Sequence, residues 1–127
     1  VRDGHLDQYP EGSTISPLGY AIWPDGLRLV LDRLHAELPN TDLLIAEYGI
    51  GTDDDDVRAT YLAAGLNITH DAISRGIPIR GFFHWTAVDN YEWLHGFDVK
   101  FGIIDVDRNV RPSASVLKFE ALSNLEK

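Results

Sequence analysis

The sequence of 127 residues contains no cysteine and no methionine, and its apolar residues never form a long unbroken run. Without cysteine the chain can form no disulfide and has no thiolate to act as a nucleophile or a metal ligand. A membrane-spanning helix needs roughly 18 or more consecutive apolar residues, and no run approaches that length. These absences exclude disulfide-stapled and thiol-dependent proteins, and we expect no membrane partner.

Basic residues are also scarce. The chain has 11 Lys and Arg against 20 Asp and Glu, which gives a formal net charge of −9 at pH 7. Because surfaces that bind nucleic acid are basic, we expect no nucleic-acid partner. The five histidines show no spacing typical of a metal site, and no glycine-rich loop is of the kind that cradles phosphates. We therefore expect neither a metal nor a cofactor.

The chain starts with the segment Val1 to His5, which is neither a signal peptide nor a start at an initiator methionine. We therefore expect a processed or excised piece of a longer protein. The lack of a signal peptide and of cysteine favours a cytoplasmic location without assigning one.

Apolar spacing and turn residues predict three helices and two strands. The expected order is loop 1–22, helix 23–38, strand 43–47, helix 55–76, strand 79–85, an extended excursion or short hairpin over 96–107, and helix 113–126. Apolar residues three or four apart predict the buried faces of the helices. They are Leu27, Val30, Leu31, Leu34 and Leu38 in the first helix, Val57, Tyr61, Ala64, Ile68 and Ala72 in the second, and Val116, Phe119 and Leu122 in the last.

The strand at 43–47 is the centre of the prediction. Four apolar residues, Leu43 to Ala46, precede Glu47, and Gly49 follows. A continuous apolar run predicts a strand buried on both faces, as in a parallel sheet. The carboxyl ends of the strands carry the active site in a parallel α/β barrel, so Glu47 is a candidate catalytic group. The alternative is an acidic residue in a strand-end turn.

Four consecutive aspartates, Asp53 to Asp56, precede the second helix. A calcium loop needs alternating oxygen ligands with a turn glycine among them, and this run has neither. Aspartate is favoured at helix N-termini, where it accepts hydrogen bonds from unpaired amides. We therefore interpret the run as a helix cap.

The alternation of helix and strand is that of parallel α/β architecture. Two parallel strands alone would leave both edges with unpaired backbone groups. A complete barrel of this type needs eight strands and about 250 residues. The sequence therefore predicts part of a fold, incomplete by itself.

A dense cluster of aromatic and hydrogen-bonding residues, Trp85 to Trp93, follows the second strand. Sugars present apolar C–H faces that stack on aromatic rings, and hydroxyl edges that need polar partners. A carboxylate beside an indole, as in Glu92 and Trp93, can supply both contacts to one ring. The cluster therefore indicates a sugar site. The alternative is that its aromatic rings fill the core or cap the bottom of a barrel.

Three motifs in order resemble those of family 1 glycoside hydrolases, the retaining β-glucosidase and β-galactosidase group. The segment from Ala46 to Gly49 stands where that family has Thr-Glu-Asn-Gly after barrel strand seven. The segment from Trp85 to Trp93 matches Trp-Ser-Leu-Leu-Asp-Asn-Phe-Glu-Trp after strand eight, and Lys100 to Gly102 matches Arg-Phe-Gly. The resemblance runs from Gly19 to about Leu122. It implies the C-terminal portion of a (β/α)₈ TIM barrel, with about strands seven and eight and their helices.

The resemblance also implies roles for individual residues. Glu47 is similar to the nucleophile that forms a covalent glycosyl-enzyme. Trp85, Glu92, Trp93 and Phe101 are similar to the wall of the sugar subsite, where the glutamate holds two adjacent hydroxyls. Family members that act on phosphorylated sugars usually replace the Glu-Trp pair, so the resemblance implies a non-phosphorylated β-glycoside as substrate.

Two departures from the family pattern lie beside the nucleophile position, Ala46 for Thr and Tyr48 for Asn. The family's acid/base glutamate lies in an Asn-Glu-Pro motif, which this sequence lacks. We therefore expect activity only with an N-terminal barrel fragment on a second polypeptide that supplies the acid/base. The alternatives are a non-catalytic sugar-binding fragment or pseudoenzyme, and an inactive half-barrel homodimer.

Overall fold

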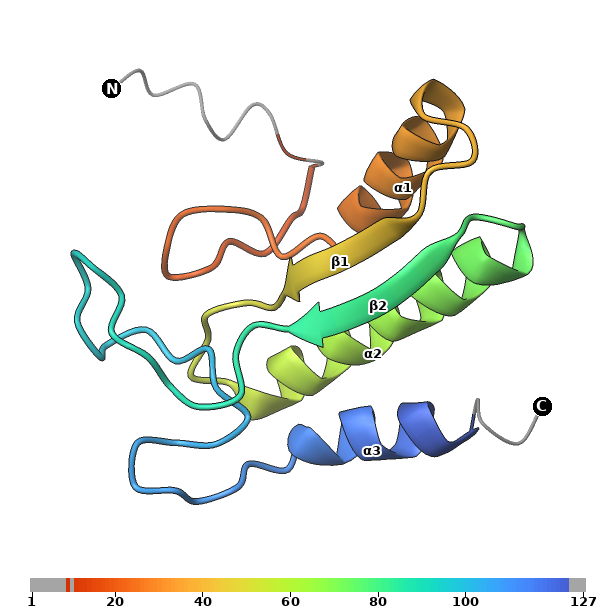
Figure 1. The fold of residues 1–127 in the computed structure, drawn as a ribbon. Helices are drawn as coiled ribbons and strands as arrows, with labels where there is room; N and C mark the ends of the chain where they lie inside the picture. Colours follow the sequence, from red (N-terminus) through yellow and green to blue (C-terminus); the bar gives the residue numbers. More distant parts are fainter. Residues whose placement is uncertain (1–8, 10, 124–127) are drawn as a thin grey trace.

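A computed structural model of the chain describes residue 9 and residues 11–123, with side chains up to residue 118. Its elements are α1 (Asp25–Glu37), β1 (Leu43–Tyr48), α2 (Asp55–Ser74), β2 (Ile79–His84) and α3 (Ala114–Ser123) (Figure 1). Where an end lies within the described residues, it differs from the expected one by at most two positions. The expected positions 124–126 of the last helix, and 1–8 and 10 of the first loop, lie outside the description. None of the described helices is long and apolar enough to cross a membrane.

Helix α2 has a distinct cap at each end. The Asp54 side chain accepts hydrogen bonds from the amides of Asp56 (3.0 Å) and Val57 (3.2 Å), which confirms the predicted capping role of the acidic run. At the other end Gly76 has a φ of 91°, and the amides of Gly76 and Ile77 bond back to the last turn. This is a Schellman motif, and it turns the chain sharply toward β2.

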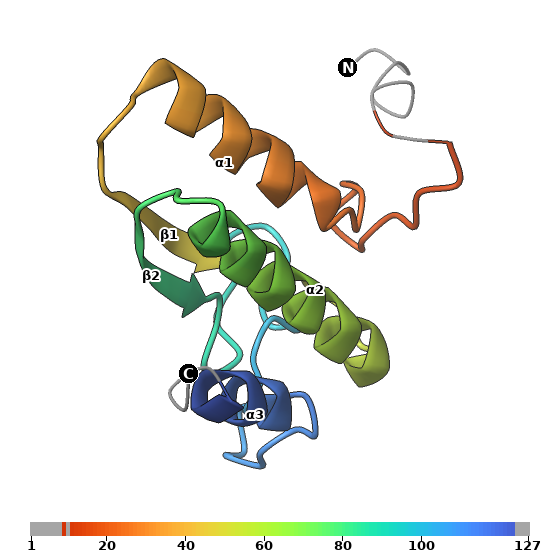
Figure 2. The ribbon, with the colours of Figure 1, turned by 90° about the vertical axis from the view of Figure 1, so that its right-hand side faces the viewer.

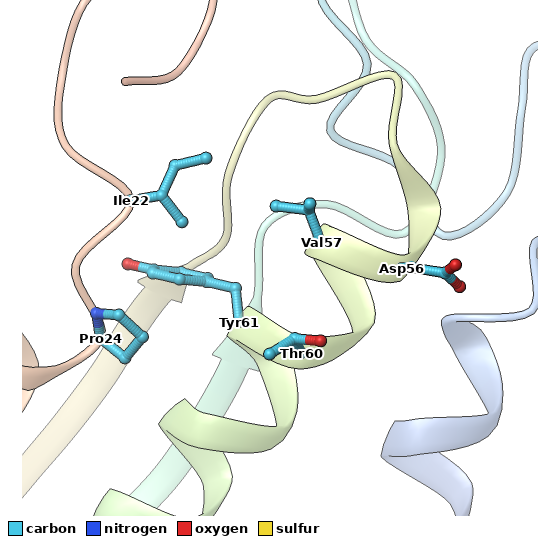
Figure 3. Close-up of a pocket in the computed structure, with 6 residues that line it drawn as sticks. All are labelled: Ile22, Pro24, Asp56, Val57, Thr60 and Tyr61. Atoms are coloured by element: carbon cyan, nitrogen blue, oxygen red, sulfur yellow. The ribbon is translucent and has the colours of Figure 1, made fainter. Parts of the chain in front are cut away.

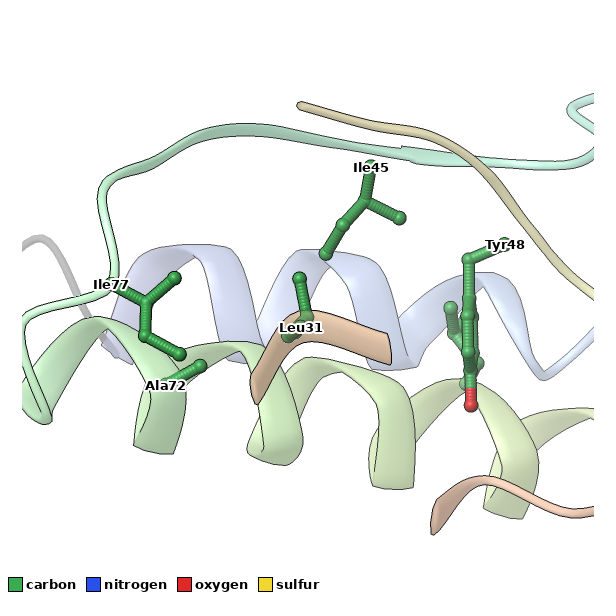
Figure 4. Close-up of a cluster of buried hydrophobic side chains, with 6 residues drawn as sticks. Leu31, Ile45, Tyr48, Ala72 and Ile77 are labelled. Atoms are coloured by element: carbon green, nitrogen blue, oxygen red, sulfur yellow. The ribbon is translucent and has the colours of Figure 1, made fainter. Parts of the chain in front are cut away.

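The two strands pair in parallel, and α2 makes the crossover between them. Figure 2 shows α1 and α2 on one side of this pair, and α3 packs against α2. The core lies between the strands and these helices (Figure 4). Its fully buried members are Leu31, Ile45, Tyr48, Leu62, Ala72 and Ile77.

The opposite face of the strand pair is open, so the expectation of a strand buried on both faces is wrong for this chain. Leu44 of β1 and Phe83 of β2 are 59% and 57% exposed. In a closed parallel barrel this face points to the interior, where side chains of the other strands cover it. The apolar run in β1 therefore suits an environment that these 127 residues do not supply.

The buried faces of the helices also differ from the expected ones. Val30 of α1 and Leu38, which directly follows the helix, are half exposed, and only Leu31 of the expected face is fully buried. In α2 the fully buried stripe is displaced by one residue over most of its length. It consists of Arg58, Leu62, Gly65, Thr69 and Ala72. Apolar spacing misses this stripe because two of its members, Arg58 and Thr69, are polar and donate to backbone carbonyls. In α3 Val116 packs against the core, whereas the side chains of Phe119 and Leu122 lie outside the description.

The expected extended excursion over 96–107 is a series of turns with isolated bridges. Gly96 bridges Glu92, and Ile104 bridges both Val88 and Val110. A turn closed by Asp105 follows, since its carboxylate accepts from the backbone amide of Asn109 at 2.9 Å and from the side-chain amide at 3.0 Å. Among the described residues no strand forms here, because the backbone hydrogen bonds of this segment form only isolated bridges and turns.

Candidate active site

The carboxyl ends of β1 and β2 lie side by side. The carbonyl oxygen of Tyr48 accepts hydrogen bonds from the Trp85 amide and from His84 Nδ1, both at 3.0 Å. A Cβ atom at Gly49 would lie 1.7 Å from the Trp85 carbonyl oxygen, so only glycine fits this close approach. The contact holds the end of one strand against the loop that leaves the other.

A bulge in β1 directs Glu47 away from the core. Ile45 pairs with Phe82 and Tyr48 pairs with His84, so β1 has one residue more than β2 between these pairs. Strict alternation would send Glu47 to the same face as the buried Ile45. With the extra residue, Tyr48 enters the core and Glu47 is exposed. A bulge that re-aims a side chain is typical of the neighbourhood of active sites.

Tyr48, which departs from the family pattern, is therefore a core residue. Its ring stacks on Tyr61 with centroids 4.6 Å apart, and its hydroxyl donates to the Tyr61 carbonyl at 3.1 Å. Space for the ring depends on Gly65, where a Cβ would lie 2.3 Å from a Tyr48 ring carbon. Burial raises the pKa of the Tyr48 phenol, and the neighbouring Tyr61 raises it further. The substitution thus places no phenol beside Glu47.

Glu47 shares a cavity of about 470 Å³ with residues of the loop after β2. The lining residues are Glu47, Trp85, Asn90, Tyr91, Glu92 and Trp93. Four of the five site residues expected from the sequence are thus brought together. Asn90 and Tyr91 belong to the aromatic and polar cluster noted in the sequence but were not singled out. The volume lies within the range of small-molecule sites.

Phe101 is placed apart from these residues. It is 5% exposed and packs against Gly51, where a Cβ would lie 3.1 Å from two of its ring carbons. Phe101 is not among the residues that line the cavity. In this structure it supports the loops beneath the site and does not form the wall expected from the resemblance.

A buried ion pair holds the loop that carries Asn90 and Glu92. Asp89 accepts from Arg111 at 2.6 and 3.1 Å and from the Gly102 amide at 2.7 Å. Burial alone would raise the pKa of Asp89, but these hydrogen bonds outweigh it and the pKa lies below its usual value. Both ends of the loop are thereby fixed while its tip reaches the cavity.

A fully buried arginine joins the loops after β1 and β2. Arg58 is 1% exposed, and its guanidinium bonds to the carbonyls of Thr52 and Lys100 and to the carboxylate of Asp55. Asp55 in turn accepts from the amide and hydroxyl of Ser113 at 2.8 and 2.7 Å. The starts of α2 and α3 are thus tied to the loops after β1 and β2.

Two further side chains near the site were not found from the sequence. Burial raises the pKa of Tyr20, and the charge of Glu92 raises it further. Burial lowers the pKa of His84, whose Nδ1 donates to Tyr48. His84 directly precedes Trp85 in the chain, whereas the link between Tyr20 and Glu92 exists only in the folded chain.

Another cavity, of about 330 Å³, lies between the segment before α1 and the first turns of α2 (Figure 3). It is lined by Ile22, Pro24, Asp56, Val57, Thr60 and Tyr61, and Figure 3 shows Asp56 directed away from the ring of Tyr61. With a single carboxylate it offers no pair of groups for acid–base chemistry. Among the described residues, no group of three or more His, Asp or Glu could hold a metal ion.

A carboxylate at the end of one parallel strand, beside an aromatic and acidic loop from the next, is the arrangement expected at the carboxyl-terminal face of a parallel α/β barrel. The family model for glycosyl hydrolase family 1 matches residues 5–120. The chain belongs to this family. Its relatives are glycoside hydrolases, and the fold is the C-terminal portion of a (β/α)₈ barrel, as the sequence predicts.

Individual relatives agree with this assignment. A β-galactosidase of Saccharolobus solfataricus is 37% identical over 112 residues, covering 84% of this chain and 23% of the relative. Thermostable β-glucosidase B of Thermobispora bispora is 41% identical over 103 residues, covering 72% of this chain and 22% of the relative. The β-glycosidase structure from Thermosphaera aggregans superposes with a TM-score of 0.83 at 37% identity, covering 91% of this chain and 25% of that one. The chain thus spans about a quarter of the relatives it matches.

Proposed function

We propose that this chain is the part of a retaining β-glycosidase that carries the nucleophile, Glu47, and half of the sugar subsite. The substrate is a non-phosphorylated β-glycoside. The observation that carries the proposal is the shared cavity, in which Glu47 lies with Trp85, Glu92 and Trp93. Family membership supports the reaction class. An N-terminal barrel portion on a second polypeptide completes the site.

The reaction needs two carboxyl groups about 5–5.5 Å apart. In the first step a Glu47 oxygen attacks the anomeric carbon as the glycosidic C–O bond breaks, and an acid protonates the leaving oxygen. In the second step the same group takes a proton from water, whose oxygen displaces Glu47 and releases the sugar. The N-terminal portion supplies that acid/base.

Glu92 is the other carboxylate of the cavity, and its proposed role is to bind substrate. It is half-buried, and one of its oxygens already accepts from Asn90. A carboxylate held in this way accepts hydrogen bonds from sugar hydroxyls. The indoles of Trp85 and Trp93 supply apolar faces for the ring and N–H donors at their edges.

The non-catalytic alternative rested on the substitutions beside Glu47. Tyr48 lies in the core, stacked on Tyr61, so its phenol does not disturb the nucleophile. Ala46 removes a hydroxyl without adding bulk. Hydrolysis is therefore the function that these contacts favour.

Replacing Glu92 with glutamine tests the sugar subsite. A hydrogen bond to a charged group contributes about 1.5–3 kcal/mol, so kcat/KM for an aryl β-glycoside should fall about tenfold to a few hundredfold. Much of the loss should lie in kcat, because these contacts strengthen as the ring distorts toward the transition state. The thermal midpoint should change little.

Trp93→Ala is the matched variant for this experiment. Trp93 is 88% exposed in this chain, so its removal should weaken catalysis without unfolding the protein. A structural aromatic cluster would give the reverse pattern, with unfolding by Trp93→Ala and unchanged kinetics in Glu92→Gln. Wild-type kcat/KM in Glu92→Gln would remove Glu92 from the sugar subsite.

A further inference from the structure

The amide of Asn90 lies against the carboxylate of Glu92 inside the cavity. Asn90 Nδ2 donates to Glu92 Oε1, and both residues line the space that also holds Glu47. A carboxylate only accepts hydrogen bonds, so the amide must present its nitrogen, and its oxygen points elsewhere. The pair is two positions apart on one loop.

The backbone that carries this pair is held by a different residue. Asp89 is bound by Arg111 and by the Gly102 amide, and it is 7% exposed. The loop therefore does not depend on the Asn90 side chain for its position. The side chain is left to act on Glu92.

The oxygen of the Asn90 amide also bears on the role of this side chain. Its Oδ1 atom is buried and has no hydrogen-bond partner among the described residues. An unpaired buried acceptor is costly, and such groups in native proteins call for an explanation. An apolar residue would fill the space at this position without the cost of an unpaired acceptor. Keeping asparagine is explained if its N–H donor has a task.

We propose that Asn90 is a positioning residue for Glu92, and that it fixes the plane of the carboxylate that binds the sugar hydroxyls. The terminal torsion of a glutamate is broad, so a free carboxylate can rotate. Donation to Oε1 removes that freedom and leaves Oε2 and the second lone pair of Oε1 for two hydroxyl donors. This inference rests on the proposed function of Glu92 and adds the group that orients it.

The test is a set of variants in the protein assembled with the rest of its barrel, assayed on an aryl β-glycoside. Asn90→Asp keeps the size of the side chain but replaces the N–H donor with an oxygen that repels Glu92. It should lower kcat/KM roughly tenfold to a hundredfold, and more than Asn90→Ala does. A space-filling role would give the opposite order, since aspartate fills the site and alanine does not.

Introducing Asn90→Asp into a Glu92→Gln background should lower kcat/KM little further. There the aspartate accepts from the new side-chain amide, so the hydrogen bond is restored with donor and acceptor exchanged. The double variant should match Glu92→Gln within about twofold, whereas independent effects would multiply. A full additional loss in the double variant would overturn the proposal.

Asn109→Asp is the matched control. Asn109 donates its side-chain amide to Asp105 at 3.0 Å in an exposed turn, so the chemical change is the same but lies outside the cavity. Its kcat/KM should stay within about twofold of wild type. Unchanged activity in Glu92→Gln would contradict the sugar-binding role of Glu92. A normal loss in Glu92→Gln with wild-type activity in Asn90→Asp would contradict the positioning role alone.

Discussion

Replacing Glu47 with alanine in the assembled protein is expected to lower hydrolysis of an aryl β-glycoside by roughly 10⁴-fold or more. No covalent intermediate can form without the carboxylate, so both steps of the retaining route are lost. Fold stability should change little, because the bulge keeps Glu47 exposed and outside the core. The measurement is kcat/KM together with the thermal midpoint.

Azide should partly restore turnover in Glu47→Ala. The small anion can occupy the vacated space and attack the anomeric carbon directly, so the product should be the glycosyl azide of inverted configuration. The control is Glu37→Ala, which removes an exposed carboxylate that accepts from Arg33 at 2.8 Å on the surface of α1. Such surface pairs contribute little, and this variant should keep wild-type activity. Unchanged hydrolysis in Glu47→Ala would remove Glu47 from the mechanism.

The isolated chain is expected to be inactive and to lack the behaviour of a cooperatively folded monomer. Within the described part of the chain neither strand pairs with a third one, and the inner face of the pair exposes Leu44 and Phe83. On α1, Leu29 and Val30 are 51% and 54% exposed. Open edges and apolar surface of this kind lead to aggregation or oligomerisation. The proposed acid/base group also belongs to the N-terminal portion.

Light scattering and thermal unfolding, with and without the N-terminal barrel portion, test this expectation. Addition of that portion should give a defined complex, a cooperative transition and hydrolytic activity. A cooperatively unfolding monomer of the isolated chain would contradict the account of its open face. A stable, inactive homodimer that ignores the N-terminal portion would support the half-barrel alternative instead.

Much of the scaffold was predictable from local rules. The cap at Asp54 and the glycine end of α2 at Gly76 are local in sequence, so residue type and spacing are enough to find them. The parallel order of β1 and β2 follows from the helix between them. Glu47 could be noticed because it ends an apolar run.

What could not be predicted depends on contacts between distant residues. Arg58 is buried because it bonds to carbonyls 6 and 42 positions away, and no apolar pattern reveals such a residue. The bulge that directs Glu47 outward comes from its pairing with β2. Tyr48 could be assigned to the core only once its stack on Tyr61 and the space at Gly65 were known.

In the loop after β2, too, some features were predictable from local sequence and others depend on contacts between distant residues. Its aromatic and polar composition indicated a sugar site, and the structure gathers Trp85, Glu92 and Trp93 in one cavity. The sequence did not show that neighbouring residues of this loop have different roles. Asp89 holds the loop through Arg111, 22 positions away, while Asn90 contacts Glu92. Phe101 is buried under the loops because Gly51 leaves room for its ring.

The central claim is that Glu47 forms the covalent bond to the sugar. In a 2-deoxy-2-fluoroglycoside the fluorine slows both steps, whereas a good leaving group speeds the first step only. Breakdown is then slower than formation, and the glycosyl-enzyme accumulates. The assembled protein should gain the mass of one fluorosugar, and peptide mapping should place it on Glu47, with Glu47→Ala unlabelled. A label on another residue, or turnover of the substrate with no covalent adduct at all, would contradict the claim.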